Sequence, residues 1–509
     1  MSFDLEAVRD RYPKLDLPHR AWVDAAAFLS QSPLRCFVAG EWCEAPNRFS
    51  TLDPGSGEEL AEVYEADEEL VDRAVRAGRA GLQNWRTRSP RQREATLRDL
   101  ADLIEQNLDV LAIIEALDGG RLITEVRGWE IADAIWNLRY FCGWASKAEG
   151  TTIPVSVPNI LNYTVREPVG VVAGIVPWNY PLLFAVERIS AALAFGNALC
   201  LKPSEETPLS ALYLARLVAE LDLPEGIVNV LPGRGDVTGE ALVRHEGVNK
   251  VAFTGSVETG KHIARVAADT LKRVTLELGG KSPNIIFDDA PMDVAVEGAF
   301  GGIFTNAGQV CTAGSRLFIA DGIHDEMLAE LSGRARALRL GHGLDPATEL
   351  GPLVSGRQRR RVLDYIRSGK EEGANLVAGG EEPNDPRLKD GFFVSPTIFT
   401  LDSDNLRIAQ EEIFGPVVTV QRFRTLEEVV EAANRTTYGL AAGVWTRDIG
   451  RAHQMARLID AGTVWINTFN LFDPASPAGG RKMSGVGREY GRAALECYTE
   501  LKSVWVNLD

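Results

Sequence analysis

The sequence predicts an α/β fold that contains a doubly wound parallel sheet, a second α/β region and a small β arm. Between Val169 and about Asp288, short apolar runs alternate with helical patterns at the spacing of βαβ units. The chain has 509 residues, of which 45% are hydrophobic and 25% charged, as is typical of a soluble globular protein. This length is sufficient for several domains and a large core.

The sequence of the N-terminal part predicts an extension, followed by a strand and a helix. Residues 1–35 are interpreted as a solvated tail or an extra surface helix, with a helical pattern near Ala21–Leu29. A strand-like run follows at Arg35–Trp42. Ser89 to Gln92 form a capping box with proline at the first helical position, and Gly119 marks the end of that helix. Apolar residues recur at helical spacing between them: Leu100, Leu103, Ile104, Leu108 and Leu111.

The alternating region predicts strands that are separated by helices. The strand-like runs are Val169–Val176, Ala198–Leu201, Ile227–Leu231, Val251–Phe253 and Val274–Leu278. The helical patterns between them are Pro208–Leu221, Val237–His245 and Val257–Asp269. We therefore expect one domain at residues 36–147 and 169–280, and a second α/β domain at residues 281–482.

The remaining segments, residues 148–168 and 483–509, predict the arm. Ser503–Leu508 alternates like a short strand, and Thr152–Val165 could pair with it. An isolated arm of this kind buries too little surface to be stable alone, so we expect it to pair with another subunit.

The charge and the cysteines argue against several classes of partner and site. A formal net charge of −17 argues against nucleic acid and against an anionic membrane surface. The six cysteines lack short paired spacings and the histidines do not cluster with them, which favours reduced thiols in a cytoplasmic protein and no metal site. The start of the chain does not resemble a signal peptide. The uncharged run Val169–Val186 contains Pro177-Trp178-Asn179-Tyr180-Pro181, so it predicts a strand, a loop and a helix rather than a membrane span.

Segments that follow the predicted strands indicate a dinucleotide site. Gly233-Arg234-Gly235, with Gly239 further on, lacks the usual glycine spacing and is a weak signal. Val251–Ser256 is a better candidate, because Ser256 would open a helix whose free N–H groups favour a pyrophosphate. The alternative is that Ser256 only caps that helix.

Lys202-Pro203-Ser204-Glu205 closes another strand at the carboxyl edge of the sheet, where such folds bind ligands. Lys202 could donate to ribose hydroxyls. Glu205 could accept from the adenosine ribose and would repel a 2′-phosphate, which favours NAD over NADP. The alternative for Glu205 is a solvated loop acid.

Cys311 and Glu277 together indicate covalent catalysis with a separate base. Small and amide-bearing residues surround Cys311, so a substrate can approach the thiol. Strand alternation points Glu277 away from the apolar face of its strand, and two glycines follow it. This pair suits the formation and hydrolysis of a thioester. Asn179 could donate its amide to the developing oxyanion beside the Cys311 N–H, or it satisfies only its own loop.

Motifs in the same order resemble those of the aldehyde dehydrogenase superfamily, of the non-acylating, NAD(P)-dependent type: Pro177–Pro181, Lys202–Glu205, Phe253–Ser256, Glu277–Lys281, Gly308–Cys311, Glu411–Pro416 and Pro477–Gly487. The resemblance runs from about residue 36 to the end of the chain. It implies a Rossmann-like cofactor domain, a catalytic domain, and an arm that makes homodimers or homotetramers.

The resemblance also implies site roles. Cys311 is the nucleophile, Asn179 the oxyanion donor, Glu277 the general base, and Lys202 a ligand of the cofactor ribose. The resemblance places Glu412 on the nicotinamide ribose and Phe414 near the nicotinamide ring. The full cofactor-binding set that it implies is Val176, Pro177, Trp178, Lys202, Ser204, Glu205, Gly235, Gly239, Phe253, Thr254, Gly255, Ser256, Leu278, Gly279, Glu412 and Phe414.

The substrate is a small-molecule aldehyde on this interpretation, in a tunnel lined by Tyr180, Phe184, Glu187, Leu471, Phe472 and Ala478. Many relatives carry Trp in place of Glu187 and an aromatic residue in place of Ala478, so an aromatic cage for betaine aldehyde is mostly missing. Glu187 either attracts an aminoaldehyde or pairs with Arg188 or Arg481.

The alternative functions are an ω-aminoaldehyde dehydrogenase, a CoA-acylating enzyme and a catalytically silent scaffold. The base Glu277 favours a free acid as the product, and the retained Cys311, Glu277 and Asn179 argue against a scaffold.

Overall fold

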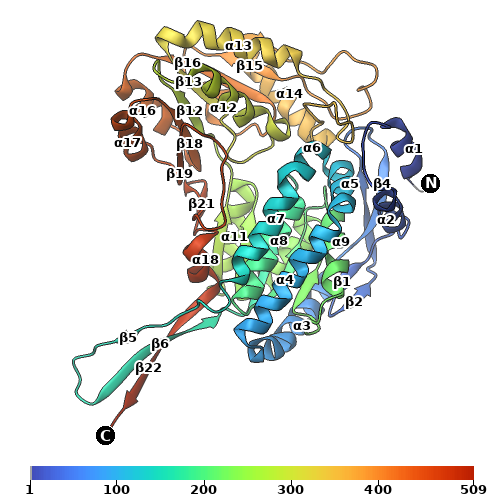
Figure 1. The fold of residues 1–509 in the computed structure, drawn as a ribbon, viewed down its shortest axis with the longest axis vertical. Helices are drawn as coiled ribbons and strands as arrows, with labels where there is room; N and C mark the ends of the chain where they lie inside the picture. The colour runs from blue at the N-terminus through green and yellow to red at the C-terminus, as the bar shows by residue number, and fades with distance from the viewer. Residues whose placement is uncertain (1–2) are drawn as a thin grey trace.

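The computed structural model describes residues 3–509, which form two large sheets with their helices and an arm that projects from the body (Figure 1). The first sheet has eight strands in the order β2-β1-β9-β8-β7-β10-β11-β21. Its central strands are parallel, and β2, β1 and β21 complete it with antiparallel pairs. The strands are β1 (Cys36–Val38), β2 (Glu41–Cys43), β7 (Val171–Ile175), β8 (Ala198–Lys202), β9 (Val228–Val230), β10 (Lys250–Thr254), β11 (Arg273–Glu277) and β21 (Gly485–Val486).

Helices cover both faces of this first sheet. Gly78 of α3 packs against Val171 of β7, whereas Gly174 of the same strand packs against Arg188 of α8. Because Val171 and Gly174 point to opposite faces of the strand, α3 and α8 lie on opposite sides of the sheet. The helices of this part are α3 (Glu68–Thr87), α4 (Pro90–Gln106), α5 (Leu108–Gly119), α6 (Ile123–Glu125), α7 (Ile131–Cys142), α8 (Pro181–Ala194), α9 (Leu209–Ala219), α10 (Glu240–Arg244), α11 (Val257–Ala268) and the π-helices η1 (Val126–Glu130) and η2 (Gly235–Gly239).

The predicted strands of the alternating region are confirmed as β7, β8, β9, β10 and β11, and two of its predicted helices as α9 and α11. The helix expected at Val237–His245 differs in detail. It opens as a π-turn at Gly235–Gly239 and continues as the short α10. The doubly wound parallel sheet expected from the sequence is therefore present.

The second sheet has seven strands in the order β14-β15-β16-β13-β12-β18-β19, and only β14 is antiparallel to its neighbour. Its strands are β12 (Pro283–Ile286), β13 (Arg316–Ala320), β14 (Asn375–Ala378), β15 (Thr397–Thr400), β16 (Val417–Phe423), β18 (Ala441–Trp445) and β19 (Thr463–Ile466). Its helices are α12 (Met292–Phe304), η3 (Thr305–Gly308), η4 (Asp321–Ile323), α13 (His324–Ala337), α14 (Gly356–Glu371), α15 (Arg407–Gln410), α16 (Leu426–Asn434) and α17 (Ile449–Leu458). Two strand pairs lie outside the large sheets, β3 (Asn47–Leu52) with β4 (Glu59–Glu65) and β17 (Tyr438–Gly439) with β20 (Arg481–Lys482).

The arm is a three-stranded antiparallel sheet, β22-β6-β5, that extends away from the body (Figure 1). It consists of β5 (Thr152–Ile153), β6 (Ile160–Pro168) and β22 (Thr499–Asn507), and α18 (Gly491–Tyr498) leads into it. The expected pairing of the C-terminal strand with the segment after residue 152 is confirmed. The segment 483–509 also supplies β21 to the first sheet, so only its later part forms the arm.

The N-terminal extension forms two helices, α1 (Leu5–Arg11) and α2 (His19–Leu29). The helical pattern near Ala21–Leu29 is confirmed as α2. Phe28 of this helix is buried, and its ring meets the ring of Tyr213 of α9 edge-on at 5.3 Å. The extension is therefore a surface helix packed on the body rather than a solvated tail.

Two local predictions are wrong. The helix expected from Pro90 to Gly119 is broken at Asn107, which has φ −105° and ψ 15° and whose side chain donates to the Leu103 carbonyl at 2.9 Å. Its capping box is present. The single strand expected at Arg35–Trp42 is the hairpin β1–β2, because Ala39 and Gly40 turn the chain with φ of 58° and 80°.

The uncharged run Val169–Val186 forms β7, a loop and the start of α8, as predicted. Among the described residues, no helix has both the length and the hydropathy needed to cross a bilayer.

Candidate active site

The loop that carries Cys311 follows α12 and has an unusual backbone. Asn306, Ala307 and Gly308 are consecutive residues with φ of 50°, 53° and 72°. Such a conformation costs about 1–3 kcal/mol at each residue other than glycine, so other contacts must hold it. At Gly308 a side chain is excluded, because a Cβ atom would lie 2.1 Å from the carbonyl oxygen of Gly415.

Side-chain amides hold this loop in place. Asn306 Nδ2 donates to the carbonyls of Asn179 (3.1 Å) and Gln309 (3.2 Å). Gln309 Nε2 donates back to the Asn306 carbonyl at 3.1 Å, and Gln309 Oε1 accepts from the Val354 N–H at 2.9 Å. The strained backbone before Cys311 is thus fixed by buried hydrogen bonds, and the thiol has a defined position.

The Cys311 residue is partly exposed, but its thiol lies in a poorly solvated place. Burial above all, together with the carboxylates of Glu412 and Glu277, raises the pKa of the thiol to about 12. Both carboxylates therefore lie within electrostatic reach of the sulfur. At neutral pH the thiol is protonated in this structure, so its use as a nucleophile requires a base.

Glu277 ends β11 and lies on the face that sequence alternation predicts. Leu278 packs on Gly260 of α11, whereas Glu277 Oε1 lies beside Gly479, 2.6 Å from the place of a Cβ atom there. This oxygen is buried and has no hydrogen-bond partner among residues 3–509. Burial raises the pKa of the carboxyl well above its usual range, Glu489 raises it further, and Arg188 lowers it. A carboxylate in this environment is a strong base when it is ionised.

Asn179 lies in the loop between β7 and α8, and 4% of its surface is exposed. Its Nδ2 donates to the Gln309 carbonyl at 3.0 Å, two residues before Cys311. An amide nitrogen carries two hydrogens, so one donor remains for a second acceptor. The structure thus brings Asn179 to the Cys311 loop and joins the two by hydrogen bonds in both directions.

The predicted dinucleotide residues gather at one edge of the first sheet, because its parallel strands end together there. Lys202 ends β8 and is buried; its Nζ lies 3.2 Å from Glu205 Oε2. Burial lowers the pKa of Lys202, and Glu205 offsets this effect. Gly239 lies against the Lys202 side chain, with 3.9 Å between its Cβ place and Lys202 Cδ. Ser204 is also buried beside Lys202, and Gly235 opens η2 nearby.

The other strand ends complete this edge. Ser256 Oγ accepts from the Thr259 N–H at 3.2 Å, so Ser256 does cap α11. Gly255 N–H donates to the Glu277 carbonyl at 3.0 Å, and Thr254 Oγ1 accepts from Arg188 at 2.6 Å. The remaining strand-end residues of the predicted set are Val176, Pro177 and Trp178 after β7, Phe253 in β10, and Leu278 after β11.

Two residues from the second sheet region reach this edge. Glu412 Oε1 accepts from the Gly280 N–H at 2.9 Å, and a Cβ atom on Gly279 would lie 2.2 Å from Glu412 Oε2. Burial raises the pKa of Glu412 to about 7. Phe414, with φ 63°, meets Trp178 edge-on at 5.2 Å. The glycine at position 279 is therefore required for the approach of Glu412.

The residues predicted for a substrate tunnel have different surroundings. Tyr180 is buried next to Phe184, with 6.3 Å between the ring centroids, and Trp129 is 5.8 Å away. Leu471 and Phe472 are 66% and 49% exposed. Ala478 pairs with Glu489 through backbone hydrogen bonds of 2.9 Å in both directions.

Glu187 is buried and accepts a hydrogen bond from the Tyr490 hydroxyl. Burial raises the pKa of Glu187 to about 8, which Arg188 partly offsets. Arg188 forms its ion pair with Glu489 at 2.6 Å, and Arg481 pairs with Asp460 instead. Glu187 therefore bonds to a tyrosine rather than to an arginine, and its raised pKa favours the protonated form at neutral pH.

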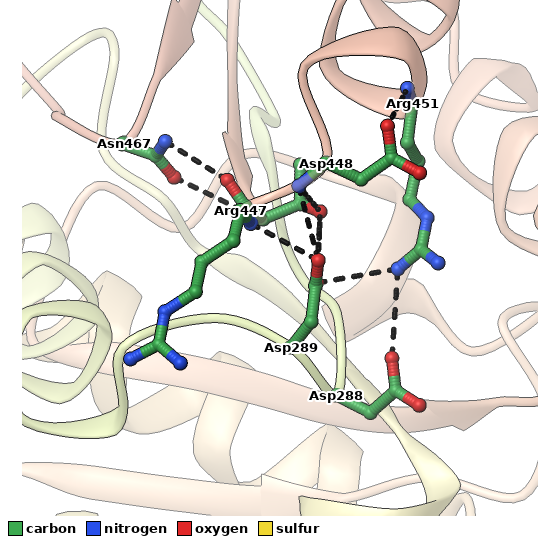
Figure 2. A network of polar contacts seen from close by, with 7 residues as sticks. Asp288, Asp289, Arg447, Asp448, Arg451 and Asn467 are labelled. Atoms are coloured by element: carbon green, nitrogen blue, oxygen red, sulfur yellow. Dashed lines mark hydrogen bonds and ion pairs between the residues drawn. The ribbon is translucent and has the colours of Figure 1, made fainter.

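The chain that leads to Leu471 and Phe472 passes through Asn467, which belongs to the polar network of Figure 2. Asp289 accepts from the Thr446 hydroxyl at 2.8 Å and from the Asp448 N–H at 3.1 Å, at the start of α17. Thr446 and Asn467 exchange hydrogen bonds of 3.0 and 2.9 Å. Three residues on, Asn470 Oδ1 accepts from Thr312 at 2.8 Å, next to the thiol residue. The network therefore fixes the chain at Asn467, before the exposed loop, and the separate Thr312–Asn470 bond joins this loop to the residue after Cys311.

Sequence reasoning missed several residues of this site: Arg121, Glu130, Thr312, Asn470 and Glu489. The only feature of the sequence that could indicate a role for Thr312 in the site is its position next to Cys311. Glu489 and Arg121 have no local pattern that points to the site, because Arg188 and the Asn179 carbonyl, which they contact, lie far away in the sequence.

The sequence and the fold of the chain are similar to those of known proteins. Residues 42–504 match the model of the aldehyde dehydrogenase family. The Bacillus subtilis (strain 168) protein DhaS is 51% identical over 483 residues, which are 94% of this chain and 97% of that protein. The human mitochondrial aldehyde dehydrogenase is 46% identical over 478 residues, or 93% and 92% of the two chains.

A solved structure, the NAD⁺ complex of an aldehyde dehydrogenase from Bacillus cereus, superposes with a TM-score of 0.94 and 47% identity. It covers 97% of this chain and 100% of that one. The agreement extends over nearly the whole chain in sequence and in fold. The chain therefore belongs to the aldehyde dehydrogenase family.

Proposed function

We propose that the protein oxidises an aldehyde to the carboxylic acid with NAD, through a thioester on Cys311. The observation that carries the proposal is the meeting of three groups from distant segments. The Asn179 amide bonds to the loop of Cys311 at 3.0 Å, and the Glu277 carboxylate lies within electrostatic reach of the thiol. A nucleophile, an oxyanion donor and a base are the groups that this chemistry requires.

The residues at the edge of the first sheet fit NAD, and we assign it to the domain formed by residues 36–147 and 169–280. Ribose hydroxyls both donate and accept, and the edge offers the donor Lys202 and the acceptors Glu205 and Glu412. The N-terminus of α11 after Ser256 suits a pyrophosphate. NAD, when bound, supplies the oxidant that accepts the hydride of the aldehyde carbon.

In the first step, the Cys311 thiol gives its proton to water, and the sulfur attacks the carbonyl carbon. The carbonyl π electrons move to the oxygen, which becomes an oxyanion. The free Nδ2 hydrogen of Asn179 and the Cys311 N–H stabilise this charge. Removal of such a donor typically costs about 2.7–4 kcal/mol of barrier. Loss of hydride then restores the carbonyl as a thioester.

In the second step, Glu277 takes a proton from water, and the hydroxide attacks the thioester carbon. The carbon–sulfur bond breaks and the Cys311 thiolate leaves. The proton held by Glu277 is then transferred to this thiolate. The product is the free acid. This role of Glu277 favours hydrolysis over transfer to coenzyme A. The raised pKa of Glu277 predicts that the rate increases with pH as the carboxyl ionises.

We favour NAD over NADP because of Glu205. Its carboxylate lies 3.2 Å from Lys202 Nζ, where it could accept from a ribose and would repel a 2′-phosphate. Measured kcat/KM for the two cofactors tests this preference. A marked preference of the wild type for NADP would contradict it.

The ω-aminoaldehyde alternative loses its main support. Glu187 is the candidate anchor for an ammonium group, but it accepts from Tyr490, and burial raises its pKa and so disfavours the carboxylate. We therefore propose aldehydes without a required amine. Comparison of propanal, benzaldehyde and 3-aminopropanal checks this point, and a strong preference for 3-aminopropanal that Glu187→Gln removes would overturn it.

Two substitutions test the catalytic roles. Cys311→Ala is expected to abolish aldehyde oxidation while NAD binding is retained, as measured by NADH absorbance and by cofactor titration. Glu277→Gln is expected to give a burst of NADH without steady turnover. Undiminished turnover in Cys311→Ala, or normal steady turnover in Glu277→Gln, would contradict the assignment.

We propose that the arm joins copies of the chain into a homodimer or homotetramer. β22 lies at an edge of the arm sheet and exposes large apolar side chains, among them Leu501 (56%) and Trp505 (57%). An exposed apolar edge strand of this length normally pairs. Sedimentation of the wild type is expected to give an oligomer, and Leu501→Glu with Trp505→Glu should dissociate it. A monomeric wild type would refute the proposal.

We also propose a cytoplasmic location. The support is that the six cysteines are free thiols, as a reducing compartment would keep them. Fractionation of cells tests the location directly.

A further inference from the structure

A buried guanidinium group lies behind the Asn179 loop and takes no part in the steps proposed above. Arg121 follows α5 and is 1% exposed. Its Nη1 donates to the Asn179 carbonyl at 2.8 Å. Its guanidinium carbon lies 4.2 Å from the centre of the Tyr180 ring. A single side chain therefore contacts both the proposed oxyanion donor and the first residue of the proposed tunnel.

The partner of Arg121 comes from a π-helix. Glu130 is the last residue of η1, between α6 and α7, and it is 1% exposed. Its Oε2 lies 2.6 Å from Arg121 Nη2, whereas Glu125 Oε2 is 3.7 Å away. A π-turn holds one residue more than an α-turn and often occurs at functional sites. A buried charge without a partner is strongly unfavourable, so Glu130 compensates the charge of the guanidinium group and holds it in place.

The carbonyl that Arg121 binds also receives a bond from the nucleophile loop. Asn306 Nδ2 donates to the same Asn179 oxygen at 3.1 Å. The Asn179 side chain, in turn, donates to Gln309 at 3.0 Å. A rotation of the Asn179 peptide would break the bonds that its carbonyl accepts from Arg121 and Asn306. The same rotation would move the Asn179 side-chain amide relative to Cys311. The position of the oxyanion donor therefore depends on what holds this carbonyl.

We propose that Arg121 is a positioning residue that, with Glu130 as its counter-ion, holds the Asn179–Tyr180 backbone so that the Asn179 amide faces the oxyanion on Cys311. The inference rests on the proposed function. Arg121 acts through Asn179 and not on the reacting atoms. Arginine suits this role because its planar fork can bind Glu130 and the carbonyl at the same time, which the single amine of lysine cannot match.

A double-mutant cycle tests the proposal. The readout is the rate of the NADH burst with a good aldehyde substrate, which reports the steps up to the thioester. Asn179→Ala is expected to lower this rate about 10²–10³-fold. Arg121→Lys is expected to lower it about tenfold or more, since small displacements of a catalytic group have large effects. In the double variant, the rate should stay within about twofold of that of Asn179→Ala.

Two results would overturn the proposal. One is a folded Arg121→Lys variant with the wild-type burst rate. The other is a double variant whose loss is the product of the single losses, which shows that Arg121 acts independently of Asn179. If Arg121→Lys does not fold, Glu130→Gln takes its place in the same cycle. A folded Glu130→Gln variant with an unchanged burst rate, or with losses that multiply, overturns the proposal equally.

A control separates positioning from the general loss of an arginine that donates to a backbone carbonyl; its side chain, that of Arg359, is 26% exposed. Arg359 also donates to a backbone carbonyl, that of Gly391 at 3.0 Å, and lies 5.7 Å from the Phe392 ring. Arg359→Lys is expected to leave the burst rate unchanged, and an equal loss there would overturn the proposal. A wild type that makes no NADH from any aldehyde refutes the proposed function itself, before the cycle begins.

Discussion

Two buried arginine–glutamate pairs lie behind the active site, and they act in different ways. Arg121 binds Glu130 at 2.6 Å and donates to the Asn179 backbone. Arg188 binds Glu489 at 2.6 Å, and both affect the pKa of Glu277, Glu489 by raising it and Arg188 by lowering it. The first pair aims a hydrogen-bond donor, and the second pair tunes a base. Two pairs of the same chemistry therefore have different roles: one fixes the geometry of Asn179, and the other sets the pKa of Glu277.

The pairs also differ in their surroundings. Arg188 lies next to Glu187 and donates to Thr254 at 2.6 Å, so it joins the end of β10 to the segment around Glu489. Arg121 lies with Glu115 and Glu130, whose carboxyl groups are fully buried. Burial raises the pKa of Glu115 to about 7 and that of Glu130 well above its usual range. A buried pair of this kind is not by itself evidence of added stability, because an apolar replacement of a whole buried pair is often neutral.

The largest effect is expected when one member of the second pair is removed. Arg188→Met leaves Glu489 buried without its partner, so the free energy of unfolding should fall by about 3–5 kcal/mol. Urea unfolding of the wild type and the variant measures the change. A fall in the free energy of unfolding of less than about 1 kcal/mol would mean that Glu489 does not depend on Arg188 as its partner. That result would contradict the expected effect of breaking this pair.

A second substitution tests whether this pair tunes the base. Glu489→Gln removes the carboxylate that raises the pKa of Glu277, while Arg188 continues to lower it. The pH at which deacylation reaches half of its maximal rate should therefore move to lower pH. Single-turnover hydrolysis of the thioester over a pH series measures this shift. The control is Glu130→Gln in the other pair, which should leave this pH unchanged; a shift of equal size there would end the distinction between the two pairs.

A third substitution, Glu187→Gln, tests how the free energy of unfolding depends on pH through the buried carboxyl next to Arg188. The pKa of Glu187 is about 8 in the folded chain, against an ordinary value near 4.5. Between these values the folded state holds a proton that the unfolded state has released, so this group's contribution to stability falls as pH rises from about 4.5 to 8. Glu187→Gln removes that fall.

The difference in the free energy of unfolding, Glu187→Gln minus wild type, should therefore increase from pH 5 to pH 8 and then level off. Urea unfolding over this pH range measures it. A difference that is independent of pH would show that Glu187 titrates normally.

The smallest effect is expected at an exposed pair of the same chemistry. Arg98 and Glu94 are four residues apart on α4, 2.6 Å from each other, and partly exposed. Arg98→Ala should change the free energy of unfolding by only about 0.3–0.5 kcal/mol. A loss of several kcal/mol in the same urea experiment would contradict the view that burial gives the two inner pairs their importance.

The sequence predicts the strands of the first sheet and the residues at its carboxyl edge well, because β-branched runs and the motifs after them are local signals. Cys311, Glu277 and Asn179 are brought together as expected. The break at Asn107 was missed because the apolar spacing continues across it, and only a side-chain bond to Leu103 shows the break.

The supporting charges were missed for another reason. Arg121 meets a carbonyl 58 residues away, and Glu489 reaches Arg188 only because the C-terminal segment returns along β11. The π-turn that places Glu130 has no recognisable sequence signal. Glu187 departs from the family pattern in the sequence, but its bond to Tyr490 depends on the same returning segment. Contacts of this kind follow from tertiary structure and not from local pattern.

The central claim is that the aldehyde carbon becomes bonded to the sulfur of Cys311 and that Glu277 is needed to release it. Mass spectrometry of Glu277→Gln, mixed with NAD and benzaldehyde and quenched in acid, tests this most directly. We expect a benzoyl group on the peptide that contains Cys311, and none on that peptide in the double variant with Cys311→Ala. Oxidation of benzaldehyde by a variant that carries no acyl group on Cys311 would contradict the account.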